Sequence, residues 1–194
     1  MEYEYDIFLS YKRGGDVEDW VVNHFHKRLH RCLESVLDRD PKIFIDKTIK
    51  TGASWPNVLK SALKSSRILV SVWSPPYFRS EWCDAEWKSM IAREQLKNLT
   101  SQQRPDGLIY PIRFSDGDTF PSQTNGIQHF CMQKWNYHAP VFEQTPKYIE
   151  FCDQMKVVAD ELKVMLENNV PAWEDWPIVQ PSPAAPVNAG VPRL

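Results

Sequence analysis

Residues 67–73 read RILVSVW and are the clearest candidate for a buried strand in this chain of 194 residues. An apolar, β-branched run without polar alternation is typical of a strand that helices cover on both faces. The next residues, SPPYF at 74–78, break the run with two prolines. The segment therefore predicts a central strand of a parallel sheet.

The stretch SEWCDAEW at residues 80–87 joins this strand to an amphipathic run. A helix that begins near Ser80 presents Trp82 and Glu86 on one face, because side chains four residues apart lie above one another. That face lies close to the carboxyl end of the preceding strand, where open α/β sheets bind ligands. The spacing therefore indicates a candidate site made of a carboxylate and a large aromatic ring.

Strands and helices are expected to alternate along the rest of the chain. Further strands are expected at residues 5–11, 42–46 and 108–114, with a shorter one within 127–135. Apolar residues at helical spacing predict helices over residues 21–36, 56–63, 80–94 and 142–166. This βαβ order predicts a parallel sheet with helices on both faces.

Particular residues predict where these elements begin or end. Asp16 is the expected N-cap of the first helix, because a short polar side chain can accept the free N–H groups of a first turn. Pro56 suits the first turn of a helix capped by Ser54 or Trp55. Pro111 lacks an N–H group and therefore predicts that residues 108–114 form an edge strand or contain a bulge.

The length of the chain is that of one domain with a tail. We expect the domain to span residues 1–167. Six of the 15 prolines lie between Pro171 and Leu194, which predicts that residues 168–194 form an extended, poorly ordered tail or linker. Trp173 and Trp176 are candidates for docking the first part of this tail.

Charge and cysteine content exclude several classes of function. The 23 basic and 25 acidic residues nearly balance and form no block of one sign, so neither nucleic acid nor a membrane is expected as a partner. Four scattered cysteines form no C-x-x-C pair, which argues against a zinc site or a disulfide framework. With neither a signal peptide nor a membrane-spanning run, the expected location is the cytoplasm.

Four segments together resemble the Toll/interleukin-1 receptor (TIR) domain family. They are residues 5–11, YDIFLSY; residues 43–46, IFID, with a loop that contains Gly52 and Trp55; residues 65–74; and residues 80–87. Their order and spacing make the resemblance specific over about residues 3–165. The resemblance implies a flavodoxin-like three-layer α/β sandwich whose five parallel strands have the order 2-1-3-4-5.

The resemblance also implies one of two functions. Many TIR domains cleave NAD+ at the bond between nicotinamide and ribose, giving ADP-ribose or a cyclic or conjugated form of it as a signal, and others only assemble. The enzymatic branch carries a glutamate in the helix after the third strand, often in the W-x-x-x-E pattern of bacterial members. Here that pattern is Trp82 to Glu86, which favours a bacterial-type, stand-alone NAD+ glycohydrolase or cyclase, a type that can act in antiphage defence.

The expected site follows from this assignment. Glu86 is the candidate catalytic residue, because a fixed carboxylate can stabilise the positive charge that develops on the ribose; its plain alternative is a carboxylate that favours the helix dipole. Trp82 offers an aromatic wall. NAD+ is the substrate, and no cofactor is expected. The other candidate substrate contacts are Ser10, Tyr11, Lys12, Arg13, Asp46 and Ser54. The alternative for each is a residue of a surface turn or loop without a role in binding.

Two other functions stay open at this stage. One is a non-catalytic module that assembles through the BB loop, Lys47 to Ser54, which also predicts self-association of the enzyme. The other is a deoxyribosyltransferase-like enzyme, which also uses a glutamate on a flavodoxin-like fold. A metal site is not expected, because His26 and His30 have zinc-compatible spacing but no convincing third ligand. The Gly14-Gly15 pair matches neither a dinucleotide fingerprint nor a P-loop.

Overall fold

The fold is built on one sheet of five parallel strands, in the order β2-β1-β3-β4-β5. A computed structural model describes residues 2–48, 55–99 and 107–182. The strands are β1 Tyr5–Ser10, β2 Ile43–Phe44, β3 Ser66–Trp73, β4 Ile109–Arg113 and β5 Phe130–Cys131. The predicted fold class and strand order are confirmed.

Strand β3 is the centre of the sheet, as its sequence predicted. It pairs with β1 on one side and with β4 on the other, with Val70 opposite Leu9 and Tyr110. Ile68, Leu69, Val70 and Val72 are fully buried. Burial on both faces explains why this segment is continuously apolar instead of alternating between apolar and polar residues.

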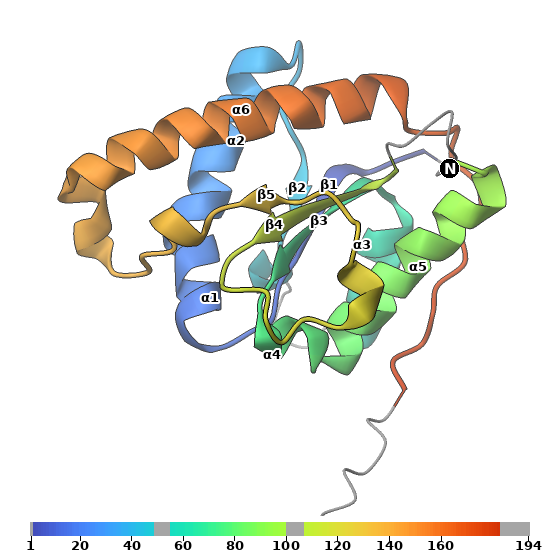
Figure 1. Ribbon diagram of the computed structural model, residues 1–194. Coiled ribbons are helices and arrows are strands. Elements are labelled where there is room, and N and C mark those ends of the chain that lie inside the picture. Colours follow the sequence, from blue (N-terminus) through green and yellow to red (C-terminus); the bar gives the residue numbers. More distant parts are fainter. Residues whose placement is uncertain (1, 49–54, 100–106, 183–194) are drawn as a thin grey trace, which may run out of the picture.

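Helices cover both faces of the sheet, so the domain has three layers (Figure 1). Helix α2 packs against α6 on one face, and α3 and α5 lie on the other. The helices are α1 Gly15–Trp20, α2 His26–Val36, α3 Trp55–Lys64, α4 Pro75–Phe78, α5 Glu81–Lys97 and α6 Pro146–Asn168. A π-helical turn at Val21–Phe25 joins α1 to α2, and short 3-10 turns occupy Asp46–Thr48, Ser122–Thr124, Gln133–Trp135 and Pro140–Gln144.

The first helix begins earlier than the sequence predicted. Its N-cap is Gly14, with a φ of 89°, and Asp16 lies inside the first turn. The cap is made from within the helix, because the backbone N–H of Gly14 donates to Glu18 Oε2 at 2.6 Å. Glycine adopts this positive φ without steric cost, which lets the chain turn sharply out of β1.

Helix α5 begins where the sequence predicted. Ser80 is its N-cap, and the Ser80 hydroxyl accepts from the backbone N–H of Cys83. The helix ends at Asn98, which has the left-handed conformation common after a last helical turn. This cap fixes the rotation of α5, and with it the direction in which Trp82 and Glu86 point.

Pro111 lies in an interior strand, so the prediction of an edge strand was wrong. Strand β4 pairs with β3 along its length, but β5 pairs with it only at Ile112 and Arg113. The Arg113 carbonyl accepts from Met132 on the β5 side, and residues two apart in a strand direct their backbone groups to the same side. The missing N–H of Pro111 therefore faces a position that β5 has not yet reached, and no ladder bond is lost.

Residues 171–182, which we call the strap, leave α6 and run beside α5 toward the carboxyl edge of the sheet (Figure 1). The strap has no regular helix or strand. Trp176 is its buried anchor, with 2% of its surface exposed. Trp176, one of the two tryptophans named as docking candidates, is therefore packed against the domain. The domain boundary at residue 167 stays a prediction.

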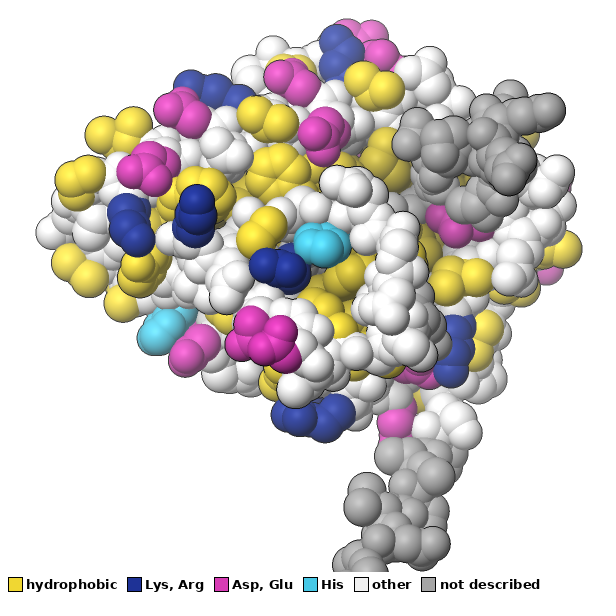
Figure 2. Space-filling model, in the orientation of Figure 1, with side chains coloured by type: hydrophobic (Ala, Val, Ile, Leu, Met, Phe, Trp, Pro, Cys, Tyr) yellow, Lys and Arg dark blue, Asp and Glu magenta, His cyan; other side chains and the backbone are white. Residues whose placement is uncertain are grey.

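The surface carries charges of both signs. On the face in Figure 2, Lys and Arg side chains are interspersed with Asp and Glu, in keeping with the nearly balanced composition. Within the described residues, no helix is both long and apolar enough to cross a membrane.

Candidate active site at the end of strand β1

Glu86 and Ser10 meet at the carboxyl end of β1. The Ser10 hydroxyl donates to Glu86 Oε2 at 2.6 Å, and its oxygen lies 3.0 Å from the Tyr77 hydroxyl. Ser10 and Tyr77 are buried, and Glu86 is only 8% exposed. The strand end, the turn after β3 and the second turn of α5 thus place three polar groups in one buried cluster.

Burial raises the pKa of Glu86 to about 8, because a carboxylate loses hydration in an apolar setting. The hydrogen bond from Ser10 opposes this shift, and the negative charge of Asp46 adds to it. Burial also raises the pKa of Tyr77 well above its ordinary value, so Tyr77 stays a neutral hydroxyl. At neutral pH the covered Glu86 is therefore mostly protonated.

A second group of predicted residues surrounds Asp46. The Tyr11 hydroxyl donates to Asp46 Oδ1 at 2.8 Å, and Arg13 Nε lies 3.3 Å from Asp46 Oδ2. The Arg13 guanidinium also lies over the Trp55 ring, 5.9 Å from its centroid. Because Trp55 in turn contacts Trp82 edge-on at 4.6 Å, aromatic rings connect this group to the Glu86 cluster.

The remaining predicted contacts differ in their placement. Lys12 is half-buried. Burial raises the pKa of the Cys83 thiol, and the nearby charge of Lys12 acts in the opposite direction. Ser54 and most of the predicted BB loop lie outside the described residues, so their roles stay predictions. Cys83 is a neutral thiol in this setting and no nucleophile.

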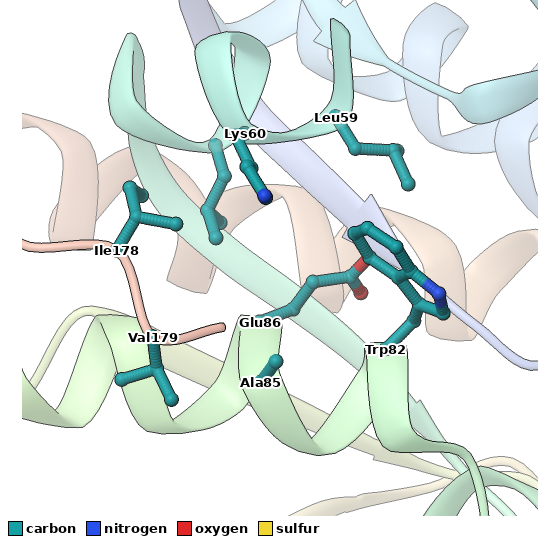
Figure 3. Close-up of a pocket in the computed structure, with 8 residues that line it drawn as sticks. Leu59, Lys60, Trp82, Ala85, Glu86, Ile178 and Val179 are labelled. Atoms are coloured by element: carbon teal, nitrogen blue, oxygen red, sulfur yellow. The ribbon is translucent and has the colours of Figure 1, made fainter. Parts of the chain in front are cut away.

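The pocket beside Glu86 is nearly filled by side chains. Figure 3 shows Glu86 pointing from α5 into a space between Trp82 of the same helix and Leu59 and Lys60 of α3. Ile178 and Val179 of the strap line the pocket as well. Its volume is about 10 Å³, which is room for one water molecule at most.

Sequence reasoning missed three contributors to this site. Tyr77 follows two prolines, and its place directly after a predicted strand was the only signal for a functional role. Lys60 lies on an ordinary amphipathic helix. The strap residues Ile178 and Val179 stand in a proline-rich context that is typical of a linker, so no local pattern marked them as lining a pocket.

A larger hollow lies at the other half of the same sheet edge. It has a volume of about 290 Å³ and is lined by Trp73, Arg113, Asp118, Phe120 and His129, among others. None of the predicted substrate contacts that the structure describes lines it. The predicted residues therefore gather at β1, next to the point where the strand order reverses, which is the usual ligand position in such sheets.

No group of three or more His, Cys, Asp or Glu side chains in the described ranges is arranged to hold a metal ion. The chemistry available at Glu86 is that of a carboxyl group with a hydroxyl donor and an aromatic wall. Such a set can stabilise a cation at a sugar carbon and orient sugar hydroxyls.

Ser10→Ala should lower the activity predicted for the Glu86 site about 10- to 100-fold and move its pH dependence to higher pH. The hydroxyl stabilises the ionised carboxylate, and a hydrogen bond to a charged group contributes roughly 1.5–3 kcal/mol. The measurement is the rate of NAD+ cleavage, the activity that the sequence predicts, between about pH 6 and 9. Ser66→Ala is the matched control, because Ser66 is also a buried serine, bonded to the Ala62 carbonyl at the opposite end of the sheet. An equal effect of both changes would contradict a specific role for Ser10.

Comparison with known proteins identifies the family of this chain. The family model described as TIR domain matches residues 7–144. The TMV resistance protein N of Nicotiana glutinosa is 33% identical over 147 residues, which are 75% of this chain and 11% of that protein. The NAD(+) hydrolase TirS of Staphylococcus aureus is 30% identical over 92 residues, 47% of this chain and 30% of that protein. The chain thus spans less than a third of either relative.

A solved structure has the same fold. The TIR domain of the Toll-related receptor TRR-2 from Hydra magnipapillata superposes with a TM-score of 0.50 at 18% identity. The superposition covers 77% of this chain and 98% of the receptor domain. At this identity the likeness concerns the fold alone.

Proposed function

The chain belongs to the TIR domain family, and on that premise we propose that it cleaves NAD+ at the bond between nicotinamide and ribose. The products are nicotinamide and ADP-ribose, or a cyclic or conjugated form of ADP-ribose. The observation that carries the proposal is the buried Glu86 carboxyl group, hydrogen-bonded to Ser10 at the carboxyl end of β1. NAD+ enters as the substrate, and we propose no resident cofactor.

The proposed reaction needs a negative charge near the ribose. When the glycosidic bond breaks, its electron pair leaves with nicotinamide, which becomes neutral, and positive charge develops at the ribose carbon. Ionised Glu86 stabilises that charge. Water then attacks the carbon and releases a proton to give ADP-ribose, or a nucleophilic group of the same molecule attacks to give a cyclic product.

Trp82 is proposed to hold the substrate beside the carboxylate. Trp82→Ala should lower kcat/KM about tenfold, because stacking of a base on an aromatic ring contributes about 1–3 kcal/mol. Trp82→Phe, which keeps an aromatic face, should retain most of the activity. Steady-state rates of nicotinamide release for the two variants measure the effect. Equal activity of both with the unchanged chain would remove Trp82 from the site.

The named relatives support the two parts of the proposal. One relative is called an NAD(+) hydrolase, which favours the reaction. Another is named for resistance to a virus, which favours a defensive signal such as one used against phage. Self-association through residues 47–54 is proposed as well.

The direct test is incubation of the full chain with NAD+ and identification of the products by chromatography and mass spectrometry. We expect nicotinamide in equal amount with ADP-ribose, or with a cyclic product that is lighter than ADP-ribose by one water molecule. Because side chains nearly fill the Glu86 pocket in this structure, the assay also includes the strap variant described below. Absence of nicotinamide from both proteins would refute the proposal, and base exchange on deoxynucleosides instead would indicate a deoxyribosyltransferase.

A further inference from the structure

The strap is held on the domain by its one buried aromatic residue. Trp176 lies under Arg93 and Lys97 of α5, with the Arg93 guanidinium 4.9 Å and the Lys97 ammonium 5.7 Å from the ring centroid. Arg93 is itself 1% exposed and donates to the Ser66 and Leu63 carbonyls. The anchor of the strap is therefore part of a built contact and not a loose surface association.

The strap continues from this anchor to the Glu86 pocket. The backbone N–H of Val179 donates to the Ser89 hydroxyl at 2.8 Å, which fixes the strap against α5 one turn after Glu86. Ile178 and Val179 then line the pocket from the side, between α3 and α5 (Figure 3). Two apolar side chains of the strap thus fill one side of the pocket that Glu86 and Trp82 also line.

Charged and polar contacts hold the strap on both sides of the pocket. Glu174 pairs with Lys97 of α5, and Asp175 pairs with Lys64 of α3. Farther along, Lys60 of α3 donates to the Gln180 side chain. The strap therefore bridges the two helices that form the walls of the pocket.

The covered pocket is too small for the proposed substrate. It measures about 10 Å³, whereas pockets for drug-sized ligands occupy about 300–1,000 Å³. We propose that the strap is an autoinhibitory element. Ile178 and Val179 must move away from the pocket beside Glu86 before NAD+ can bind there. This inference rests on the proposed function for the identity of the substrate, but the covering of Glu86 can be tested without it.

Opening also changes the state of the carboxyl group. Under the strap, burial keeps Glu86 mostly protonated at neutral pH. The groups around it are the Ser10 and Tyr77 hydroxyls, the Cys83 thiol, the Trp82 ring and Lys60 of α3, with Asp46 acting through its charge. Water that enters when the strap leaves hydrates the carboxylate and lowers its pKa, so opening both admits the substrate and ionises the group that acts on it.

The test weakens the strap without touching the pocket. The double variant Glu174→Lys and Asp175→Lys replaces two attractive contacts with repulsion from Lys97 and Lys64 and leaves Trp176, Ile178 and Val179 intact. The control variant, Asp153→Lys and Glu167→Lys, changes the net charge equally and breaks two exposed ion pairs on α6. Both variants are made in the full chain.

Three measurements separate the possible outcomes. Hydrogen exchange reports whether amides of residues 176–182 open faster. Labelling of Glu86 by a water-soluble carbodiimide and an amine, read by peptide mass spectrometry, reports its accessibility. Nicotinamide release reports activity. We expect all three to rise about tenfold in the strap variant, the effect of two strong surface ion pairs, and to stay unchanged in the control.

Each outcome decides between the two proposals. Faster exchange without increased labelling of Glu86 overturns the strap inference, because the strap then opens without uncovering the carboxyl group. If hydrogen exchange in the strap is unchanged, a second variant, Ile178→Ser with Val179→Ser, replaces the apolar side chains that line the pocket. Unchanged carbodiimide labelling of Glu86 in that variant also overturns the inference. Increased labelling of Glu86 without any nicotinamide release keeps the strap inference and refutes the proposed NAD+ cleavage.

Discussion

Glu86→Gln should reduce nicotinamide release about 100- to 1,000-fold, the loss typical for removal of one electrostatic group that stabilises a transition state. Glutamine has nearly the same size, and its amide oxygen can still accept the hydrogen bond from Ser10. The change therefore removes the negative charge and keeps the packing. The measurement is the rate of nicotinamide release with excess NAD+, made in the Glu174→Lys and Asp175→Lys background so that the pocket is open.

The control for this experiment is Glu81→Gln in the same background. Glu81 lies in the first turn of α5, so the control removes a carboxylate from the same helix at a position that belongs neither to the Ser10–Glu86 hydrogen bond nor to the residues that line the pocket. We expect its activity to stay within about twofold, as for a change outside the site. Activity of Glu86→Gln within tenfold of this control would exclude Glu86 as the residue that stabilises the ribose cation.

The second large effect concerns stability and pH. The pKa of Glu86 is raised to about 8 in the folded chain from 4.5 in an exposed setting, so between these values the folded state binds a proton that the unfolded state has released. The free energy of unfolding therefore falls as pH rises through this window, by up to roughly 5 kcal/mol in total. Below the window the contribution is complete, and above about pH 8 it is lost.

Glu86→Gln should remove this dependence. Denaturant unfolding of the two proteins at about pH 5, 6.5 and 8 measures it, and the variant should become the more stable protein as the pH rises. Burial raises the pKa of Glu94 as well, but Glu94 is present in both proteins and cancels in the difference. A constant difference between the two proteins across this range would show that Glu86 does not titrate as a buried group.

Local patterns in the sequence were sufficient to predict the centre of the fold. The apolar run of β3 and the cap at Ser80 are determined by neighbouring residues, so both could be predicted from the sequence. The sequence also predicted that Ser10 and Glu86 lie at one edge of the sheet, because the ends of adjacent parallel strands and the helix starts beside them share that edge; it did not predict the hydrogen bond between them. The predicted start of α1 was wrong, because the Glu18 side chain, inside the helix, accepts from the backbone N–H of the N-cap residue Gly14.

The features that could not be predicted from the sequence depend on contacts between residues far apart in the chain. Pro111 suggested an edge strand, but only the lengths of β4 and β5 together show that its missing N–H lies past the end of the ladder. The strap was beyond prediction for a similar reason: Val179 bonds to a residue 90 positions earlier. Two tryptophans among prolines have no periodicity, so the sequence offers candidate anchors and gives no information on where they bind.

The connection between the strap and the domain determines how the proposed inhibition responds to concentration. Helix α6 ends at Asn168, and strap contacts begin at Pro171, whose carbonyl accepts from the Tyr3 hydroxyl. An inhibitor joined by so short a tether has a local concentration of about millimolar or more, whatever the amount of protein present. Dilution is therefore not expected to relieve the proposed inhibition, and a soluble activator has to outcompete a segment that rebinds as soon as it is released.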